Sequence, residues 1–163
     1  MNLSMEKVRN AAYFSFLFVV VFALLSESAW AEASKKESNA PTSPPPTEFQ
    51  IQGFFDPDFL YLDAGHVSLK DNGNQTFTIH VVTEAKQDVS AIGATVYLQK
   101  WTGTEWINRS VKTVSTTNDW IFSGDLTANV ESGYYYRVRV IHYVNHNGTY
   151  ESGETVSGHL LAD

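Results

Sequence analysis

The sequence predicts an all-β protein, a seven-stranded antiparallel sandwich, and three observations carry that prediction. Residues Val130–Val144 alternate between two sets of side chains with a period of two, and they are rich in β-branched and aromatic residues, which is the pattern of a half-buried strand. Similar runs alternate with turn signals from His66 to Leu160, at the spacing of roughly ten residues that is typical of a sandwich or barrel. After Ala31 no helical period is sustained.

The N-terminus has the features of a secretory signal peptide. Lys7 and Arg9 precede the apolar run Ala11–Leu25, and Ala29-Trp-Ala31 matches the small-x-small cleavage pattern. We therefore expect a signal peptide over residues 1–31, cleaved after Ala31. An uncleaved membrane anchor is the alternative, but the run is short for crossing a bilayer. The sequence predicts a secreted, extracellular protein without a membrane contact after cleavage.

Composition excludes several classes of function. The 163 residues contain no cysteine, so disulfides, thiolate nucleophiles and thiolate metal sites are absent and the hydrophobic core must hold the domain. The net charge is −7, and it stays the same without residues 1–31, because two acidic and two basic residues are lost together. A net negative charge disfavours nucleic acid and anionic membranes as partners.

Between the cleavage site and the first strand lie two segments of different character. Residues 32–48 include the triplet Pro44-Pro-Pro46, which favours an extended conformation, and we interpret them as a spacer; a ligand for a proline-recognition domain is the alternative. Residues 49–163 are the predicted sandwich domain. Its lead-in, Phe49–Leu62, is strongly aromatic, and we expect it to pack on the domain instead of forming an adhesive patch for a partner.

The seven strands follow from alternation between turn signals. A polar loop is expected over 84–90, and Asn147-Gly148 is the strongest hairpin signal in the chain. Thr102-Gly-Thr104 is expected to close a second hairpin. The expected strands are His66–Lys70, Thr76–Thr83, Ile92–Trp101, Trp106–Val114, Trp120–Val130, Val130–Val144 and Thr149–Leu160.

Even-numbered residues of Val130–Val144 are expected to face the core. Two unpaired buried guanidinium groups would be very costly, so Arg137 and Arg139 place the odd-numbered set outside. His142 then lies on the apolar face, where a hydrogen-bonded core histidine is the simplest interpretation.

The motif Val130-x-Ser-Gly133-x-x-Tyr136-x-Val138-x-Val140 resembles the Leu-x-Pro-Gly-x-x-Tyr-x-Val-x-Val signature of fibronectin type III domains. The resemblance implies a Greek-key sandwich of fibronectin type III or immunoglobulin-like kind, with Tyr136 as its corner tyrosine and Gly133 in the preceding turn. The chain departs from the signature at Ser132, where proline is usual.

A combination of four stretches is similar to a family of small secreted proteins of Gram-positive bacteria: Val96–Gly103, Gly133–Arg139, His142-Tyr143 and Glu151–Gly153. That resemblance implies an exported bacterial single-domain protein and assigns it no catalytic residue.

No motif for catalysis or metal binding stands out. His142 and His146 share a strand face but lie roughly 13 Å apart, and no metal-ligand spacing occurs among the histidines. Asp71–Asn74 is better explained as a turn than as a calcium loop. Converging carboxylates and nucleophile motifs are not visible in the sequence. We therefore predict a non-enzymatic protein that needs no cofactor or metal.

The candidate ligand surface is the outward side of two strands that a fibronectin-like fold makes neighbours. Aromatic faces stack on sugar rings, and arginines bind carboxylates or phosphates. The sequence thus predicts a binding module, with polysaccharide as its expected ligand. A cross-strand ladder that only stabilises the sheet, and an extracellular structural or protein-interaction domain, are the alternatives. The candidate residues are Tyr97, Trp101, Trp106, Tyr135, Arg137, Arg139 and Tyr143.

Overall fold

The computed structural model describes residues 40–47 and 53–163. The predicted signal peptide, residues 32–39 of the spacer and residues 48–52 lie outside the described residues. Within the described ranges every regular element is a strand, as the sequence predicts. These described residues contain no helix with the length and apolarity needed to cross a membrane.

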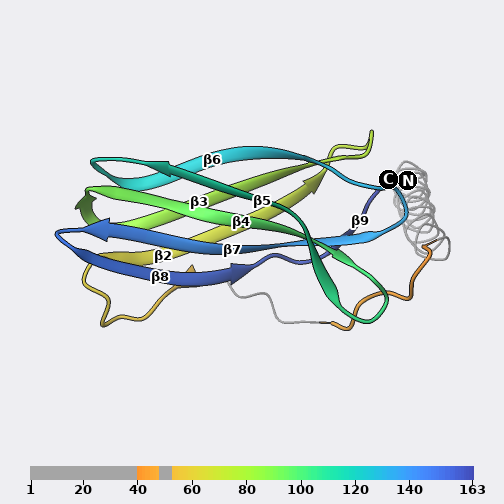
Figure 1. The fold of residues 1–163 in the computed structure, drawn as a ribbon, viewed down its shortest axis with the longest axis horizontal. Helices are drawn as coiled ribbons and strands as arrows, with labels where there is room; N and C mark the ends of the chain where they lie inside the picture. The colour runs from red at the N-terminus through yellow and green to blue at the C-terminus, as the bar shows by residue number, and fades with distance from the viewer. Residues whose placement is uncertain (1–39, 48–52) are drawn as a thin grey trace, which may run out of the picture. The chain divides into compact units, whose positions relative to one another are not determined.

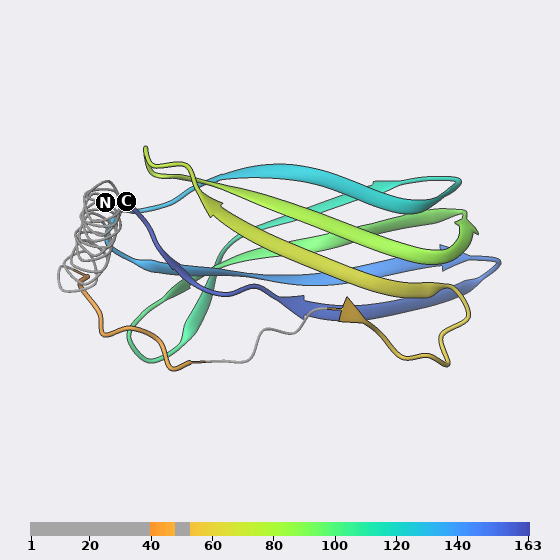
Figure 2. The same cartoon turned by 180° about the vertical axis from the view of Figure 1, so that it is seen from behind.

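The strands form two antiparallel sheets, stacked as two layers (Figures 1 and 2). The four-stranded sheet has the order β1-β2-β3-β6, and the other sheet has the order β5-β4-β7-β8, with β9 also paired to β7. The bounds are β1 Gly53–Phe54, β2 Leu62–Asp71, β3 Thr76–Val89, β4 Ala91–Trp101, β5 Trp106–Thr116, β6 Asp119–Asn129, β7 Tyr135–His146, β8 Thr149–Val156 and β9 Leu160–Leu161.

The core lies between the sheets, and the predicted face of β7 is confirmed. Val138, Val140 and Val144 are fully buried, and Phe77 of β3 meets the Tyr136 ring edge-on at 5.8 Å. The predicted Asn147-Gly148 hairpin is confirmed as well. Both residues have positive φ, 50° and 80°, as a type I′ turn requires, and the turn fixes the register of β8 on β7.

The prediction of a polar loop over 84–90 is wrong, because β3 continues to Val89. Ala85 pairs with Leu62 of β2, and both Ala85 and Val89 are buried. The polar residues between them lie in a register shift of the ladder with β6. The period of two is lost there, so alternation in the sequence gave no sign of the strand.

The described part of the aromatic lead-in packs on the domain, as expected. The Phe55 ring lies 5.6 Å from the ring of His142. It fills space over Gly65 of β2 and Gly153 of β8, where an added Cβ would lie within about 2.6 Å of its ring. By contrast, Phe54 stays 85% exposed.

A buried carboxylate holds the end of the lead-in. Glu151 of β8 accepts hydrogen bonds from the backbone N–H groups of Leu60, Tyr61 and Leu62 at 2.6, 2.9 and 2.8 Å. Burial alone would raise the pKa of the Glu151 carboxyl, but these backbone donors, with Lys86 nearby, bring that pKa below its usual value. The carboxylate form therefore stabilises the folded lead-in.

Residues 40–47, which we expected to act only as a spacer, pack on the sandwich. The indole Nε1–H of Trp101 donates a 3.0 Å hydrogen bond to the carbonyl oxygen of Ser43. Pro45 is buried, and Ala40 packs against the cluster of Trp101, Tyr135 and Leu161. In both views the orange segment lies beside the hairpin of β4 and β5 (Figures 1 and 2).

Candidate functional site

The outward side of the five-stranded sheet brings most of the predicted residues together. Strands β4 and β7 are neighbours, with Tyr97 opposite Arg139 and Gln99 opposite Arg137. The predicted pairing and the outward parity of both arginines are thus confirmed. Tyr143 lies on the same side of β7, farther along the strand.

Arg137 sits in a cross-strand network. Its guanidinium carbon lies 4.5 Å from the centroid of the Trp106 ring, and its Nε–H donates to the side-chain oxygen of Gln99 at 2.8 Å. Gln99 in turn donates to Asn108 of β5 at 3.0 Å. Stacking on the indole and the hydrogen bond hold this guanidinium in one orientation.

Arg139 forms the second network. Its guanidinium lies 5.4 Å from the Tyr97 ring centroid and donates to the Glu154 carboxylate of β8 at 2.6 Å. That hydrogen bond, against the opposing effect of burial, raises the pKa of Arg139 further. The surface continues along β7 and β8 with the half-buried ring of Tyr143 and the exposed ring of Tyr150. These two rings stack, with centroids 5.9 Å apart and planes at 19°.

Trp101 and Tyr135 correct the prediction, since both were expected to be exposed and both are buried, at 6% and 2% exposure. Their parity is outward, as predicted, but Ala40 and Trp106 pack against them from outside. The Trp106 ring lies 5.2 Å from that of Trp101 and is only half-exposed. One end of the predicted surface is therefore covered by the chain itself, and the open part runs from Tyr97 to Tyr150.

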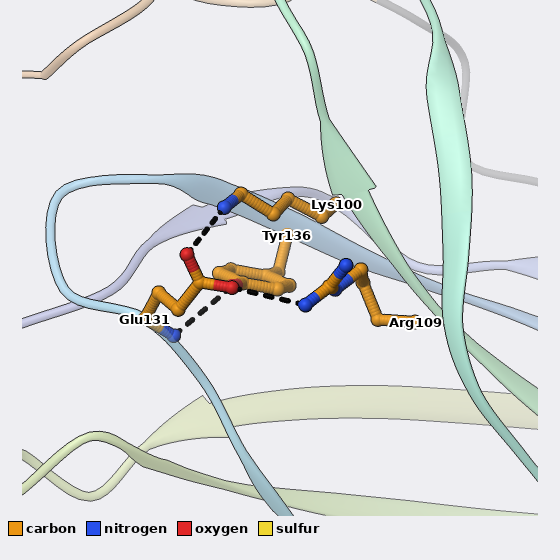
Figure 3. A network of polar contacts seen from close by, with 4 residues as sticks. All are labelled: Lys100, Arg109, Glu131 and Tyr136. Atoms are coloured by element: carbon orange, nitrogen blue, oxygen red, sulfur yellow. Dashed lines mark hydrogen bonds and ion pairs between the residues drawn. The ribbon is translucent and has the colours of Figure 1, made fainter.

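The Val130–Val140 motif predicts a corner tyrosine, and the Tyr136 hydroxyl makes a hydrogen bond to the backbone upstream of it. The backbone N–H of Glu131 donates to the Tyr136 hydroxyl at 3.0 Å (Figure 3). Glu131 also binds Lys100 of β4 at 2.7 Å and Arg109 of β5 at 3.1 Å, as the figure shows. The hydrogen bond to Lys100, against a smaller effect of burial, and the charge of Arg109 lower the pKa of Glu131. Gly133 has φ +83°, which favours glycine in the turn.

His142 is the buried, hydrogen-bonded histidine that the sequence predicts. Its Nδ1 lies 2.7 Å from the Thr83 hydroxyl and its Nε2 lies 2.7 Å from the Thr155 hydroxyl. Burial, with the nearby charge of His66, lowers the pKa of His142 to about 4. Both ring nitrogens are occupied and the side chain is fully buried, so the imidazole serves the core as a neutral group. In the described part of the chain no group of three metal-ligating side chains gathers.

Sequence reasoning missed Tyr150 and Glu154 as members of the surface. Alternation in Thr149–Leu160 places both on one side of β8, and the two-residue hairpin sets Tyr150 opposite Asn145. That register was readable from the Asn-Gly turn. The role of Glu151 had no local signal, because its partners lie about ninety residues earlier in the chain.

Comparisons with known proteins do not assign this chain to a family. No family model matches the chain, and no curated protein matches it. Among solved structures, the chain is weakly similar to a crystal structure of a protein from Archaeoglobus fulgidus, with 8% identity and a TM-score of 0.29, over 63% of this chain and 98% of that one.

Proposed function

We propose that the chain is a secreted, non-enzymatic binding module on a seven-stranded Greek-key scaffold of fibronectin type III or immunoglobulin-like kind. The strand order supports the scaffold: β2-β3-β6 would correspond to the three-stranded sheet of such domains and β5-β4-β7-β8 to the four-stranded one, with β1 and β9 as short additions. The Glu131–Tyr136 hydrogen bond supports it too. Secretion rests on the N-terminal sequence pattern.

The ligand we propose is a polysaccharide of the cell wall or the environment, bound across Tyr97, Arg139, Tyr143 and Tyr150. The observation that carries this proposal is the Tyr143–Tyr150 stack, whose outer member is 59% exposed on a sheet surface. An exposed aromatic face held in place by a second ring stacks on a sugar ring at little entropic cost. Arg139 and Glu154 lie on the same surface and offer a donor and an acceptor to sugar hydroxyl groups.

The charges favour a neutral sugar over a polyanion. Arg139 is already paired with Glu154, and Arg137 is stacked on Trp106 and bonded to Gln99. Because a polyanion would have to displace Glu154 from Arg139, hydroxyl-rich neutral chains fit the surface better.

The test is retention on insoluble polysaccharides, compared between wild type and Tyr150→Ala. Loss of the exposed ring should weaken retention about twofold to tenfold, the equivalent of about 0.5–1.4 kcal/mol, and should lower the free energy of unfolding by no more than about 1 kcal/mol, the value of a cross-strand aromatic pair. Trp120→Ala is the matched control, since Trp120 is also a half-exposed aromatic residue but lies on β6 of the other sheet. Equal retention of Tyr150→Ala and wild type, or equal loss in the control, would contradict the proposal.

A second candidate, a protein-interaction domain, is favoured by a specific feature of the free edges. Among the strands of the described residues, β5 and β6 are edge strands of different sheets, and a groove of about 370 Å³ between them reaches the side chains of Ile79 and Leu126. An unpaired edge beside an apolar groove suits strand addition by a partner. Sedimentation that shows concentration-dependent oligomers, together with no retention on glycan, would favour this function over the first.

A further inference from the structure

We propose that Trp101, Trp106 and Tyr135 form a binding site for proline-rich extended segments, here called the proline cradle, which residues 40–47 of the same chain occupy. The cradle shares no residue with the proposed polysaccharide surface of Tyr97, Arg139, Tyr143 and Tyr150, and this proposal does not depend on that one. It is built where β4 ends and β5 and β7 begin, from three aromatic side chains that belong to one cluster. His159 flanks it, with its ring 5.8 Å from Tyr135 and 6.3 Å from Trp106.

The contacts to the bound segment are those that suit a proline-rich ligand. Prolines have no backbone N–H, and chains of them form no internal hydrogen bonds, so their carbonyls remain free to accept. The Trp101 indole donates to such a carbonyl, that of Ser43, which directly precedes Pro44. Pro45, two residues farther along the segment, is buried. Indole donors and aromatic walls are the recurring means of recognising proline-rich segments.

The start of the segment lies next to two turns, each of which contains a glycine with positive φ. Gly103, in the turn between β4 and β5, has φ +102°, and Gly133, in the turn between β6 and β7, has φ +83°. A Cβ at Gly103 would lie 3.5 Å from Thr42, and one at Gly133 would lie 3.4 Å from Pro41. The side chains of Pro41 and Thr42 therefore lie next to these two turns, and the positive φ, not lack of space, is what favours glycine at both positions.

The segment is also prepared for binding by its own sequence. Proline fixes its own φ, and it restricts the residue before it to extended conformations. Pro44-Pro-Pro46 therefore restricts the backbone from Ser43 to Pro46 before it binds. Little conformational entropy remains to be lost on docking, so a short segment is enough.

One contact shows that the chain's own segment is an imperfect occupant. The Thr42 hydroxyl oxygen is buried and has no hydrogen-bond partner among the described residues. Burial of an unpaired hydroxyl opposes binding, so a segment with an apolar side chain of the same shape at this position fits better. We infer that the natural occupant in trans is a proline-rich segment of a partner protein, with the chain's own segment as a weaker competitor.

The test uses the full chain with Pro44→Gly, Pro45→Gly and Pro46→Gly together, which keeps the chain length and weakens the segment. The added probe is a peptide of the sequence Ala40–Thr47, and binding is followed by the indole N–H resonance of Trp101. A tethered competitor acts at an effective concentration of about millimolar. The wild type should therefore bind the peptide about tenfold more weakly than the triple variant, if the peptide binds at about 100 μM.

Three matched comparisons make the test specific. A peptide with glycines at the three proline positions should not bind. A peptide with Thr42→Val should bind at least about fivefold more tightly than the parent, since the unpaired hydroxyl is gone. In the triple variant, Trp101→Phe keeps an aromatic face without the N–H donor and should weaken binding about fivefold; binding to this variant is followed by the indole N–H resonance of Trp106, the neighbouring ring of the cradle.

A folded triple variant that shows no saturable binding, or that binds the glycine peptide equally well, overturns the proposal. If the triple variant does not fold, the wild type is titrated with the Thr42→Val peptide to several millimolar. Movement of the Ser43 and Thr47 amide resonances to free-peptide positions then supports exchange at the cradle. Unchanged resonances overturn it, because the segment is then a fixed part of the fold.

Discussion

Acid should destabilise this domain in a pH window set by one buried histidine. The folded-state pKa of His142 is lowered to about 4 from 6.5 by burial, with a smaller effect from His66. The unfolded chain therefore binds one more proton than the folded chain between pH 6.5 and 4, and stability falls as the pH falls through that window. Each pH unit is worth about 1.4 kcal/mol, so the full loss is about 3 kcal/mol.

The measurement is urea unfolding at pH 7.5, 6, 5 and 4.5, with the free energy of unfolding taken at each pH. The lowered pKa values of Glu131 and Glu151 add their losses only below about pH 4.5, the ordinary value for that carboxyl, so the window above it isolates the histidine. His142→Gln keeps hydrogen-bonding capacity toward Thr83 and Thr155 without titrating, and it should flatten the profile. A wild-type profile that is already flat between pH 7.5 and 4.5 would refute the buried neutral imidazole.

Three further predictions concern stability. Tyr136→Phe should lower the free energy of unfolding by about 1 kcal/mol, because the Glu131 N–H loses its acceptor; an unchanged thermal midpoint would contradict the corner. Trp101→Ala should cost about 3–5 kcal/mol, the opposite of what outward parity alone suggests, since the side chain is buried; calorimetry decides, and a cost under about 1 kcal/mol would show an open face. Glu151→Gln should cost about 1–3 kcal/mol and raise the amide exchange rates of Leu60, Tyr61 and Leu62, while protection that persists would mean that the carboxylate is dispensable.

Strand parity was predictable from the sequence because the pleat fixes it. Two arginines in Val130–Val144 were enough to decide which side of β7 faces water, and Tyr136 and His142 then fell on the core side, as the structure confirms. A one-residue slip would have inverted every one of these assignments. The Asn147-Gly148 turn fixed the neighbouring strand in the same way, through its φ values.

What covers a sheet face was not predictable from parity. Trp101 and Tyr135 point away from the sandwich core, yet a proline-rich segment more than fifty residues earlier lies over Trp101. A period of two distinguishes only the two sides of a sheet, and a third layer on one side leaves no trace in it. The composition of residues 40–47 suggested a spacer, because proline is usually read as a sign of exposed chain and seldom as a packing residue.

The two arginines also bear on how the open surface would work. Exposed arginine side chains ordinarily lose rotamer freedom when a ligand orders them. Here Trp106 and Gln99 hold Arg137, while Tyr97 and Glu154 hold Arg139, all through contacts that exist in the folded chain. Folding has already ordered these groups. A ligand that contacts these side chains without breaking the Arg139–Glu154 pair therefore binds a preorganised surface. A ligand that must break the pair loses that advantage. The stabilising ladder and the binding surface, which the sequence offered as alternatives, are for this reason compatible: the contacts that stiffen the sheet are the ones that would make it a platform.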